Sequence, residues 1–580
     1  MRPGKKFSSG LLPTFLFLIA MLIAACGGGT TPNTTPHTKA SSDKQVFVAG
    51  VEEGNADLYS FDPAIPPDQL SAYAIDMVFT GLVQIDDQEK VKPQLASSWD
   101  ISSDHLTYTF HLRPNLTFSD GTPLTSADVA YSIDRALQPS LQSTTAPYYL
   151  KYIKDSDKLA AGSIKTIIGD SIKTPDANTV VITANKPVPF FLKAMTFQCA
   201  FIVEKSLITK YGKTWTDHLN LGGGDGPFTV QSYVHSKQIV FVPNPRYYGP
   251  RPLLQKVIFP FYKTLDSAYP AYQVNQVDET GVPLSHYPTD QHRSDFHKIP
   301  QLWINYYTMN YNQKPFDNTR IRQAFELAVN KDLIVKSVWK GSNIPTNHIV
   351  PQGQYGYNPN LTGPAGVQGT AGDPTKARQL FQQGLSEEGY TSAAQLPPIT
   401  LTYSSAGAQD VRNEVAALQQ MWQTVLGVSV KTNDIEINKL FADEGMGSSN
   451  PLQFYTGPAW IADYPDPYDW TTLQFDKGAA QNGMNFGQNK GPDAAAQQAL
   501  QQQMEQADVM QDPNARLQAY NTIEQQLVNY VAWFPMEQQT YIALVKPCVQ
   551  GYTHNAQGLI PPDDWGNIYI STDTPCAKTS

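Results

Sequence analysis

The apolar positions between residues 409 and 426 predict a helix. Apolar side chains recur there every three or four positions, and Gly427 follows as a helix-ending residue. The positions on this apolar face are Val411, Val415, Leu418, Trp422 and Val425. Short segments rich in β-formers flank the helix at 399–403 and 428–431. This order predicts the parallel strand–helix–strand crossover of an α/β protein.

Two other helices have clear start signals. Thr125-x-x-Asp128 resembles a capping box at the start of an amphipathic helix. Asp512-Pro513 begins another helix as a cap and a first-turn proline, and we expect Pro535 to end it.

Two segments complete the predicted pattern. Residues 106–112 alternate apolar and polar side chains, which is the period of a half-buried strand. The glutamine-rich segment 494–510 keeps good helix formers and predicts a solvated helix. The alternation of strand and helix patterns along the chain indicates the α/β class.

The N-terminus has the pattern of an export signal. A basic start precedes an apolar run at 11–23, which is too short to span a bilayer. Small residues at 24 and 25 directly precede Cys26, and this resembles the lipobox cut by the lipoprotein signal peptidase. We expect residues 1–25 to be removed and Cys26 to carry a lipid. The alternative is a plain signal peptide that is cut after Ala25.

Residues 26–43 predict a flexible tether. They are rich in Gly, Thr, Pro and Ser, and they have too little apolar surface to offset the entropy of ordering them. The remaining chain is long enough for two or more lobes.

Charge and cysteine content narrow the class of protein. A formal net charge of −10 argues against a nucleic-acid partner, which would require a basic face. Outside the cytoplasm, the three cysteines of the body imply one disulfide and one leftover thiol. We expect Cys548 to pair with Cys576 and to leave Cys199. Three free thiols are the alternative.

Several motifs together resemble the family 5 extracellular solute-binding proteins, the oligopeptide- and dipeptide-binding proteins of ABC importers. The resemblance covers about Val46 to Gly551 in the expected order. The motifs are Leu95-Ala96-Ser97-Ser98-Trp99, the segments 106–113 and 118–129, Gly226-Pro227-Phe228 with Asn244-Pro245-Arg246-Tyr247-Tyr248-Gly249, and the segment 315–324.

The resemblance implies a two-lobed, periplasmic-binding-protein-like α/β fold, with hinged lobes and an extra subdomain on the first lobe. Ligand would lie between the lobes, which close over it. The expected ranges are 44–85, 222–308 and 535–575 for the first lobe, 86–221 for the subdomain and 309–534 for the second lobe.

The resemblance also implies a ligand-binding aspartate. Peptide-binding members hold the ligand's α-amino group with an aspartate in a stretch resembling residues 460–467, and Asp463 is the matching position. Alternatively, Asp463 only caps a proline-rich turn. Trp460 and Tyr464 are expected either to wall the cleft or to pack in the core.

The rest of the ligand site is less defined by the sequence. Some relatives place an arginine six residues before the aspartate, where it meets the ligand carboxylate, but this chain has Gly457. How a carboxylate is bound therefore stays open. Glu52 follows the first strand, where family members approach the ligand backbone, and is expected to contact ligand.

Motifs for catalysis are missing from the sequence. It contains no His-Glu-x-x-His, no Gly-x-Ser-x-Gly and no phosphate loop ending in Gly-Lys-Ser or Gly-Lys-Thr. The glycines at 222–226 are expected to form a turn. His286, His292 and His297 have weak spacing for a metal site. We expect no enzyme activity, cofactor or metal.

These observations predict an extracytoplasmic substrate-binding protein of an ABC importer, lipid-anchored to the outer or periplasmic face of the cell membrane. Its expected partners are a peptide and the permease subunits, and we expect a monomer. One alternative is the same fold with a non-peptide cargo such as an oligosaccharide or a metal chelate. Another is a surface sensor or adhesion protein that has no transport role.

Overall fold

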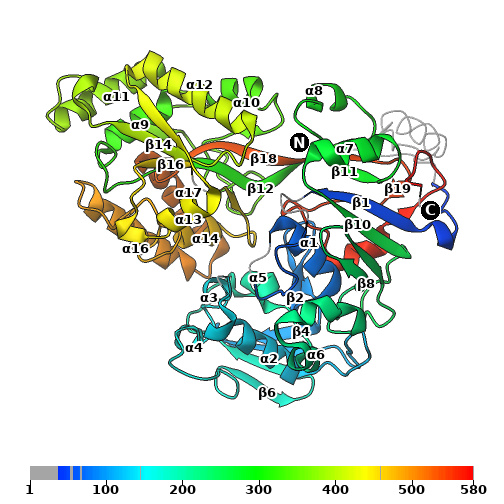
Figure 1. Ribbon diagram of the computed structural model, residues 1–580. Coiled ribbons are helices and arrows are strands. Elements are labelled where there is room, and N and C mark those ends of the chain that lie inside the picture. Colours follow the sequence, from blue (N-terminus) through cyan, green and yellow to red (C-terminus); the bar gives the residue numbers. More distant parts are fainter. Residues whose placement is uncertain (1–36, 53–56, 66–67, 144, 457–458, 579–580) are drawn as a thin grey trace, which may run out of the picture.

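The computed structural model describes residues 37–52, 57–65, 68–143, 145–456 and 459–578. The expected signal peptide and the lipidated Cys26 lie outside these residues. Figure 1 shows two large lobes joined by long strands, with a smaller subdomain, coloured cyan, below the first lobe. No helix in the described ranges is long and apolar enough to cross a membrane.

One sheet, of twelve strands within the described residues, runs through both lobes. Its order is β15 (Val430–Asp434), β14 (Ile399–Tyr403), β16 (Phe454–Thr456), β12 (Phe296–Met309), β18 (Phe534–Val545), β11 (Glu279–Gly281), β1 (Val46–Glu52), β10 (Lys256–Tyr262), β9 (Gln238–Pro243) and β8 (Phe228–Val234), with β13 (Ile344–Pro345) on β18 and β17 (Trp460–Ile461) on β12. The long strands β12 and β18 pair antiparallel and carry the chain between the lobes (Figure 1). Their register shifts between Pro300 and Ile304. The expected boundaries at 308/309 and 534/535 lie near the second-lobe ends of these two strands.

The predicted crossover forms the centre of the second lobe. Helix α12 spans Gln409–Leu426, and Gly427 follows in the left-handed conformation with a φ of 69°. Strands β14 and β15 pair in parallel, as the sequence predicted. The apolar face of α12 covers them, with Trp422 fully buried against Phe454. The other helices of this lobe are α9 (Thr319–Leu327), α10 (Lys331–Ser337), α11 (Pro374–Glu387), α13 (Ile437–Glu444), α14 (Pro467–Trp470), α15 (Thr472–Phe475), α16 (Ala494–Asp508) and α17 (Pro513–Tyr530).

Helices α16 and α17 differ in part from expectation. Helix α16 is not simply solvated, because Gln497 and Gln501 are buried and hydrogen-bonded to the loop beneath them. Asp512 caps α17 by accepting a hydrogen bond from the Ala515 N–H. Helix α17 ends before Pro535, which lies within β18.

The first lobe and its subdomain have separate sheets. Helices α1 (Gln69–Val78), α7 (Leu265–Gln273) and α8 (Tyr287–Asp290) belong to the first lobe. The subdomain sheet is antiparallel in the order β4 (Ala96–Ile101), β5 (Thr107–Leu112), β7 (Thr179–Thr183) and β6 (Ile172–Asp176). The subdomain also contains β3 (Val91–Pro93), α2 (Ser126–Ala136), α3 (Ala146–Tyr149), α4 (Ser156–Ala160), α5 (Phe191–Ala194) and α6 (Lys205–Tyr211). Strand β3 pairs with β2 (Val83–Ile85), which lies at the end of the first-lobe range. Strand β5 alternates in burial as predicted, and the Thr125–Asp128 capping box is present.

The C-terminal tail packs back on the first lobe. Strands β19 (Val549–Gln550) and β20 (Tyr569–Ile570) pair, and Cys548 forms a disulfide with Cys576, with Cα atoms 5.7 Å apart. Cys199 is a buried free cysteine. Lys39 pairs with Ser571. The expected tether therefore does not extend to residue 43, because residues 39 and 40 already contact the tail.

Candidate ligand-binding site

Two adjoining cavities lie where the lobes and the subdomain meet. Their volumes are about 220 Å³ and about 400 Å³. They share Gln69, Ile461 and Gln557 as lining residues. The first cavity is lined by α1, by β2 and the segment after α5, and by the residues that follow β17. The second lies against the ends of β1 and β11 and against β18. A ligand here would contact all three regions.

Asp463 lines the first cavity directly after β17. Its position is fixed by the backbone, because the Ala462 N–H donates to the Leu302 carbonyl at 2.8 Å. The Tyr149 hydroxyl, from the subdomain, donates to the Asp463 carboxylate. Burial raises the pKa of Asp463 to about 7. This carboxylate is therefore held at the cavity wall without a basic partner among the described residues.

Asp469 holds the Asp463 backbone and the Trp460 side chain in place through hydrogen bonds. Its Oδ2 accepts hydrogen bonds from the Asp463 N–H and the Trp460 Nε1, each at 3.2 Å. Burial and the neighbouring Asp463 charge raise the pKa of Asp469 well above its ordinary value. The turn-capping role falls to Asp466, whose carboxylate accepts from the Tyr468 N–H at 3.1 Å.

Trp460 and Tyr464 occupy packing positions. Neither lines either cavity. Trp460 is half-buried, with its indole nitrogen bonded to Asp469. Tyr464 is 1% exposed and stacks on Phe190 of the subdomain. Both side chains therefore pack in this structure, which is one of their two expected roles, and contact with a ligand stays a prediction.

Glu52 lies on the wall of the second cavity, at the end of β1. Burial and the charge of Asp266 raise its pKa to about 7. Glu279 lies on the same cavity, and burial together with the charge of Glu52 raises its pKa to about 7. The Tyr541 hydroxyl donates to Glu279 at 2.6 Å.

Sequence reasoning missed Asp76 and Glu279. Asp76 lies on α1 and lines the first cavity, and burial raises its pKa to about 7. The available signal was one carboxylate within the otherwise apolar stretch 72–79. An unpaired acid on such a face indicates either a functional site or a buried partner.

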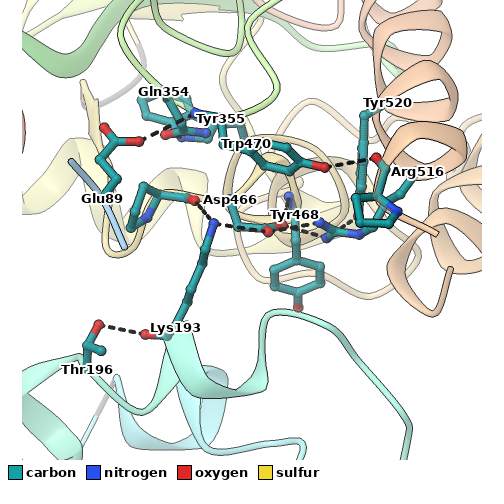
Figure 2. Close-up of polar contacts among 12 residues, drawn as sticks. Glu89, Lys193, Thr196, Gln354, Tyr355, Asp466, Tyr468, Trp470, Arg516 and Tyr520 are labelled. Carbon is teal, nitrogen blue, oxygen red and sulfur yellow. Dashed lines mark hydrogen bonds and ion pairs between the residues drawn. The ribbon is translucent and has the colours of Figure 1, made fainter. Parts of the chain in front are cut away.

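The subdomain and the second lobe touch beside the first cavity, through what we call the closure contacts: Lys193 with Pro465 and Asp466, and Glu89 with Tyr355. Figure 2 shows Lys193 reaching from α5 toward Asp466. Its Nζ donates to the Pro465 carbonyl at 2.6 Å and lies 3.8 Å from the Asp466 carboxylate. The Tyr355 N–H donates to Glu89 at 3.4 Å.

An apolar layer extends the same interface. Phe190 of the subdomain stacks on Tyr468 with ring centroids 4.3 Å apart. Both tyrosines of this stretch, Tyr464 and Tyr468, belong to a cluster formed mostly by subdomain residues. The two regions therefore bury apolar surface against each other.

A comparison with models of known protein families shows which family this chain belongs to. The model for bacterial extracellular solute-binding proteins, family 5 Middle, matches residues 90–482. The chain belongs to this family.

Individual family 5 proteins agree with this assignment. The chain is 28% identical over 483 residues to the oligopeptide-binding protein OppA of Bacillus subtilis, which covers 81% of this chain and 84% of OppA. It is 27% identical over 536 residues to the dipeptide-binding protein DppE of the same organism, with coverages of 90% and 92%. Relatives of this family 5 protein are thus named for peptide binding.

Solved structures confirm the two-lobed fold of this family 5 protein. The Escherichia coli murein tripeptide binding protein MppA superposes with a TM-score of 0.72 at 25% identity, covering 91% of this chain and 99% of MppA. Listeria monocytogenes OppA bound to peptide superposes with a TM-score of 0.70 at 21% identity, covering 91% and 99%.

Replacing Lys193 by methionine is expected to weaken ligand binding by this family 5 protein about fivefold, because a smaller population of closed receptor reduces apparent affinity. Methionine keeps the apolar stem and removes the ammonium that meets Pro465 and Asp466. Calorimetric titration with peptide measures the effect. The matched control is Lys173→Met, an exposed lysine on β6 of the same subdomain. Equal affinities of the two variants would show that the Lys193 contact does not favour closure.

Proposed function

We propose that this protein is the lipid-anchored, extracytoplasmic receptor of an ABC importer, which binds peptides between its lobes and delivers them to the permease. It has no catalytic role in this proposal. Cys26 would carry the lipid, and residues 27–36 would form the tether. The observation that carries the proposal is the half-buried carboxylate of Asp463 on a cavity shared by both lobes, in a family 5 fold.

A peptide supplies what this carboxylate lacks. Its α-amino group is a cation that can replace the missing basic partner of Asp463, and a charge-assisted hydrogen bond in a buried site is strong. Ile461 of the two-residue strand β17 lines both cavities. This supports pairing of an extended peptide backbone with the β17 segment.

The side chain of Gln557 supports the same stretch. Its Nε2 lies 3.3 Å from the carbonyl of Ala462 and 3.2 Å from that of Asp463. Glu52 on the second cavity is placed to meet the ligand backbone further along. Trp460 and Tyr464 would act indirectly, through Asp469 and the closure interface.

Calorimetric titration of the full-length protein in detergent tests the proposal. Tri- to hexapeptides with a free amine are expected to bind, and N-acetylation or Asp463→Asn is expected to weaken binding by about 10- to 100-fold, the value of a hydrogen bond to a charged group. The control is Asp508→Asn, a buried carboxylate that lines neither cavity. If acetylated and free peptides bind equally, the amine anchor is wrong. If no peptide binds, the peptide cargo is wrong, and sugars and metal chelates become the next ligands to test.

A further inference from the structure

The two cavities are lined by carboxylates without cations. Within the described residues, no lysine or arginine lines either one. The acidic lining residues are Asp68, Asp76 and Asp463 in the first cavity and Glu52 and Glu279 in the second. His554 lines the second cavity, but burial lowers its pKa to about 4, so its ring is neutral. A cation on the ligand would compensate these carboxylates in their ionised forms.

These carboxylates differ in how many hydrogen bonds they already accept from the protein. Asp68 caps α1, accepting from the Ser71 N–H at 2.6 Å and the Tyr59 N–H at 3.2 Å. Glu279 accepts from Tyr541. Asp463 is assigned to the α-amino group in the proposed function. Asp76 is left without such a role.

Asp76 is a buried acceptor with spare capacity. It is 7% exposed, and in the described chain it accepts one hydrogen bond, from the Gln198 Nε2 at 3.1 Å. Gln84 lines the same cavity and is 8% exposed. Its Oε1 has no hydrogen-bond partner in the part of the chain that the structure describes. A buried acceptor that is left unpaired is costly, so the Gln84 Oε1 is available to accept a hydrogen bond from a ligand donor in this cavity.

We infer that the site selects peptides with a basic side chain near the N-terminus, whose ammonium or guanidinium group is bound by Asp76 and Gln84 while Asp463 binds the α-amino group. This inference rests on the proposed peptide binding. Lysine and arginine bring several N–H donors on a long stem, which suits two acceptors that line the same cavity. Asp76 and Asp463 line the same cavity of about 220 Å³, so both cations belong to the first residues of the ligand.

The same charge pattern opposes acidic ligands. A glutamate side chain would add a negative charge to a cavity that already holds three carboxylates, and like charges in a buried site repel strongly. The ligand's own C-terminal carboxylate finds no cation in either cavity within the described residues. It would therefore extend beyond them, and C-terminal amidation would not weaken binding.

Calorimetry with matched peptides tests the inference. The full-length protein in detergent is titrated at pH 7.5 with peptides of sequence Ala-X-Ala-Ala and X-Ala-Ala-Ala, where X is lysine, norleucine or glutamate. Norleucine has nearly the length of lysine without its charge. For at least one position, the lysine peptide is expected to bind about tenfold or more tightly than the norleucine peptide, with glutamate weakest.

Two variants test whether Asp76 causes the preference for lysine over norleucine. Asp76→Asn is expected to reduce the preference for lysine over norleucine to about twofold or less, with little change for norleucine. Asp508→Asn, a buried acid that lines neither cavity, is expected to keep the full preference.

Three negative results of these titrations lead to different conclusions. Equal binding of the lysine and norleucine peptides by the wild-type protein would overturn the inference and leave peptide binding intact, and this comparison needs no variant to fold. A preference that persists in Asp76→Asn would overturn the role of Asp76. If no peptide in the series binds, the proposed function itself fails.

Discussion

Replacing Arg516 by methionine is expected to lower the free energy of unfolding by about 3–5 kcal/mol, because it leaves the buried carboxylate of Asp466 without its bidentate partner and with only the Lys193 ammonium nearby, at 3.8 Å. Figure 2 shows Arg516 of α17 facing Asp466. The guanidinium donates to both carboxylate oxygens, at 2.9 and 2.6 Å, and the two residues are 3% and 2% exposed. The neighbouring Arg516 charge holds the pKa of Asp466 below its ordinary value despite burial. Urea unfolding followed by tryptophan fluorescence measures the loss.

Two controls make the Arg516 experiment specific. Lys439→Met removes the exposed ion pair with Asp443 on α13, and is expected to cost about 0.5 kcal/mol or less. The double variant Arg516→Met with Asp466→Asn removes both charges and is expected to recover part of the stability. If Arg516→Met lowers the free energy of unfolding no more than Lys439→Met does, the buried pair does not stabilise the second lobe.

Binding of a basic peptide is expected to weaken steeply as the pH falls from 7.5 to 5.5. Burial raises the pKa values of Asp76 and Asp463 to about 7 in the ligand-free protein, and a bound cation requires their ionised forms. Protonation therefore competes with the ligand below pH 7. Over this range the loss is about 25-fold for one such carboxylate and about 600-fold for two, which is the ratio of the ionised fractions at the two pH values for a pKa of about 7. Calorimetric titrations at five pH values measure it.

Two variants are expected to differ in how their peptide affinity depends on pH. Asp76→Asn removes one of the two titrating groups, so its affinity is expected to depend less steeply on pH than that of the wild-type protein. Asp508→Asn is expected to keep the wild-type slope. An affinity that does not change between pH 5.5 and 7.5 would mean that neither carboxylate takes up a proton in competition with the ligand.

Elements governed by local patterns could be predicted from the sequence. Helix α12 has the residues predicted for it, because its apolar period and Gly427 act within the segment itself. The same holds for the capping box at Thr125 and the cap at Asp512. The order of family motifs implied the two-lobed fold. Asp463 could be proposed because the stretch 460–467 resembles one in peptide-binding family members, yet its contact with Tyr149 joins residues 314 positions apart.

The cavity and packing residues that the sequence did not reveal depend on contacts between distant segments. Asp76 becomes a cavity residue only because α1 of the first lobe comes close to the Asp463 segment of the second lobe. Tyr464 is a packing residue because the subdomain supplies Phe190 to stack on it. Gln497 and Gln501 are polar in sequence, but the loop beneath α16 offers them backbone partners, so burial costs them little.

The pairing of β12 with β18 has a consequence for how the lobes meet. The two strands that join the lobes are hydrogen-bonded to each other, with pairs from Phe296–Leu544 to Tyr307–Phe534. Paired strands resist splaying within their sheet, so we expect any motion of the second lobe relative to the first to follow mainly one rotational coordinate. Asp76 and Asp463, which come from different lobes, would then return to a similar mutual arrangement each time the lobes meet. This preorganisation reduces the entropy lost when a ligand assembles its site.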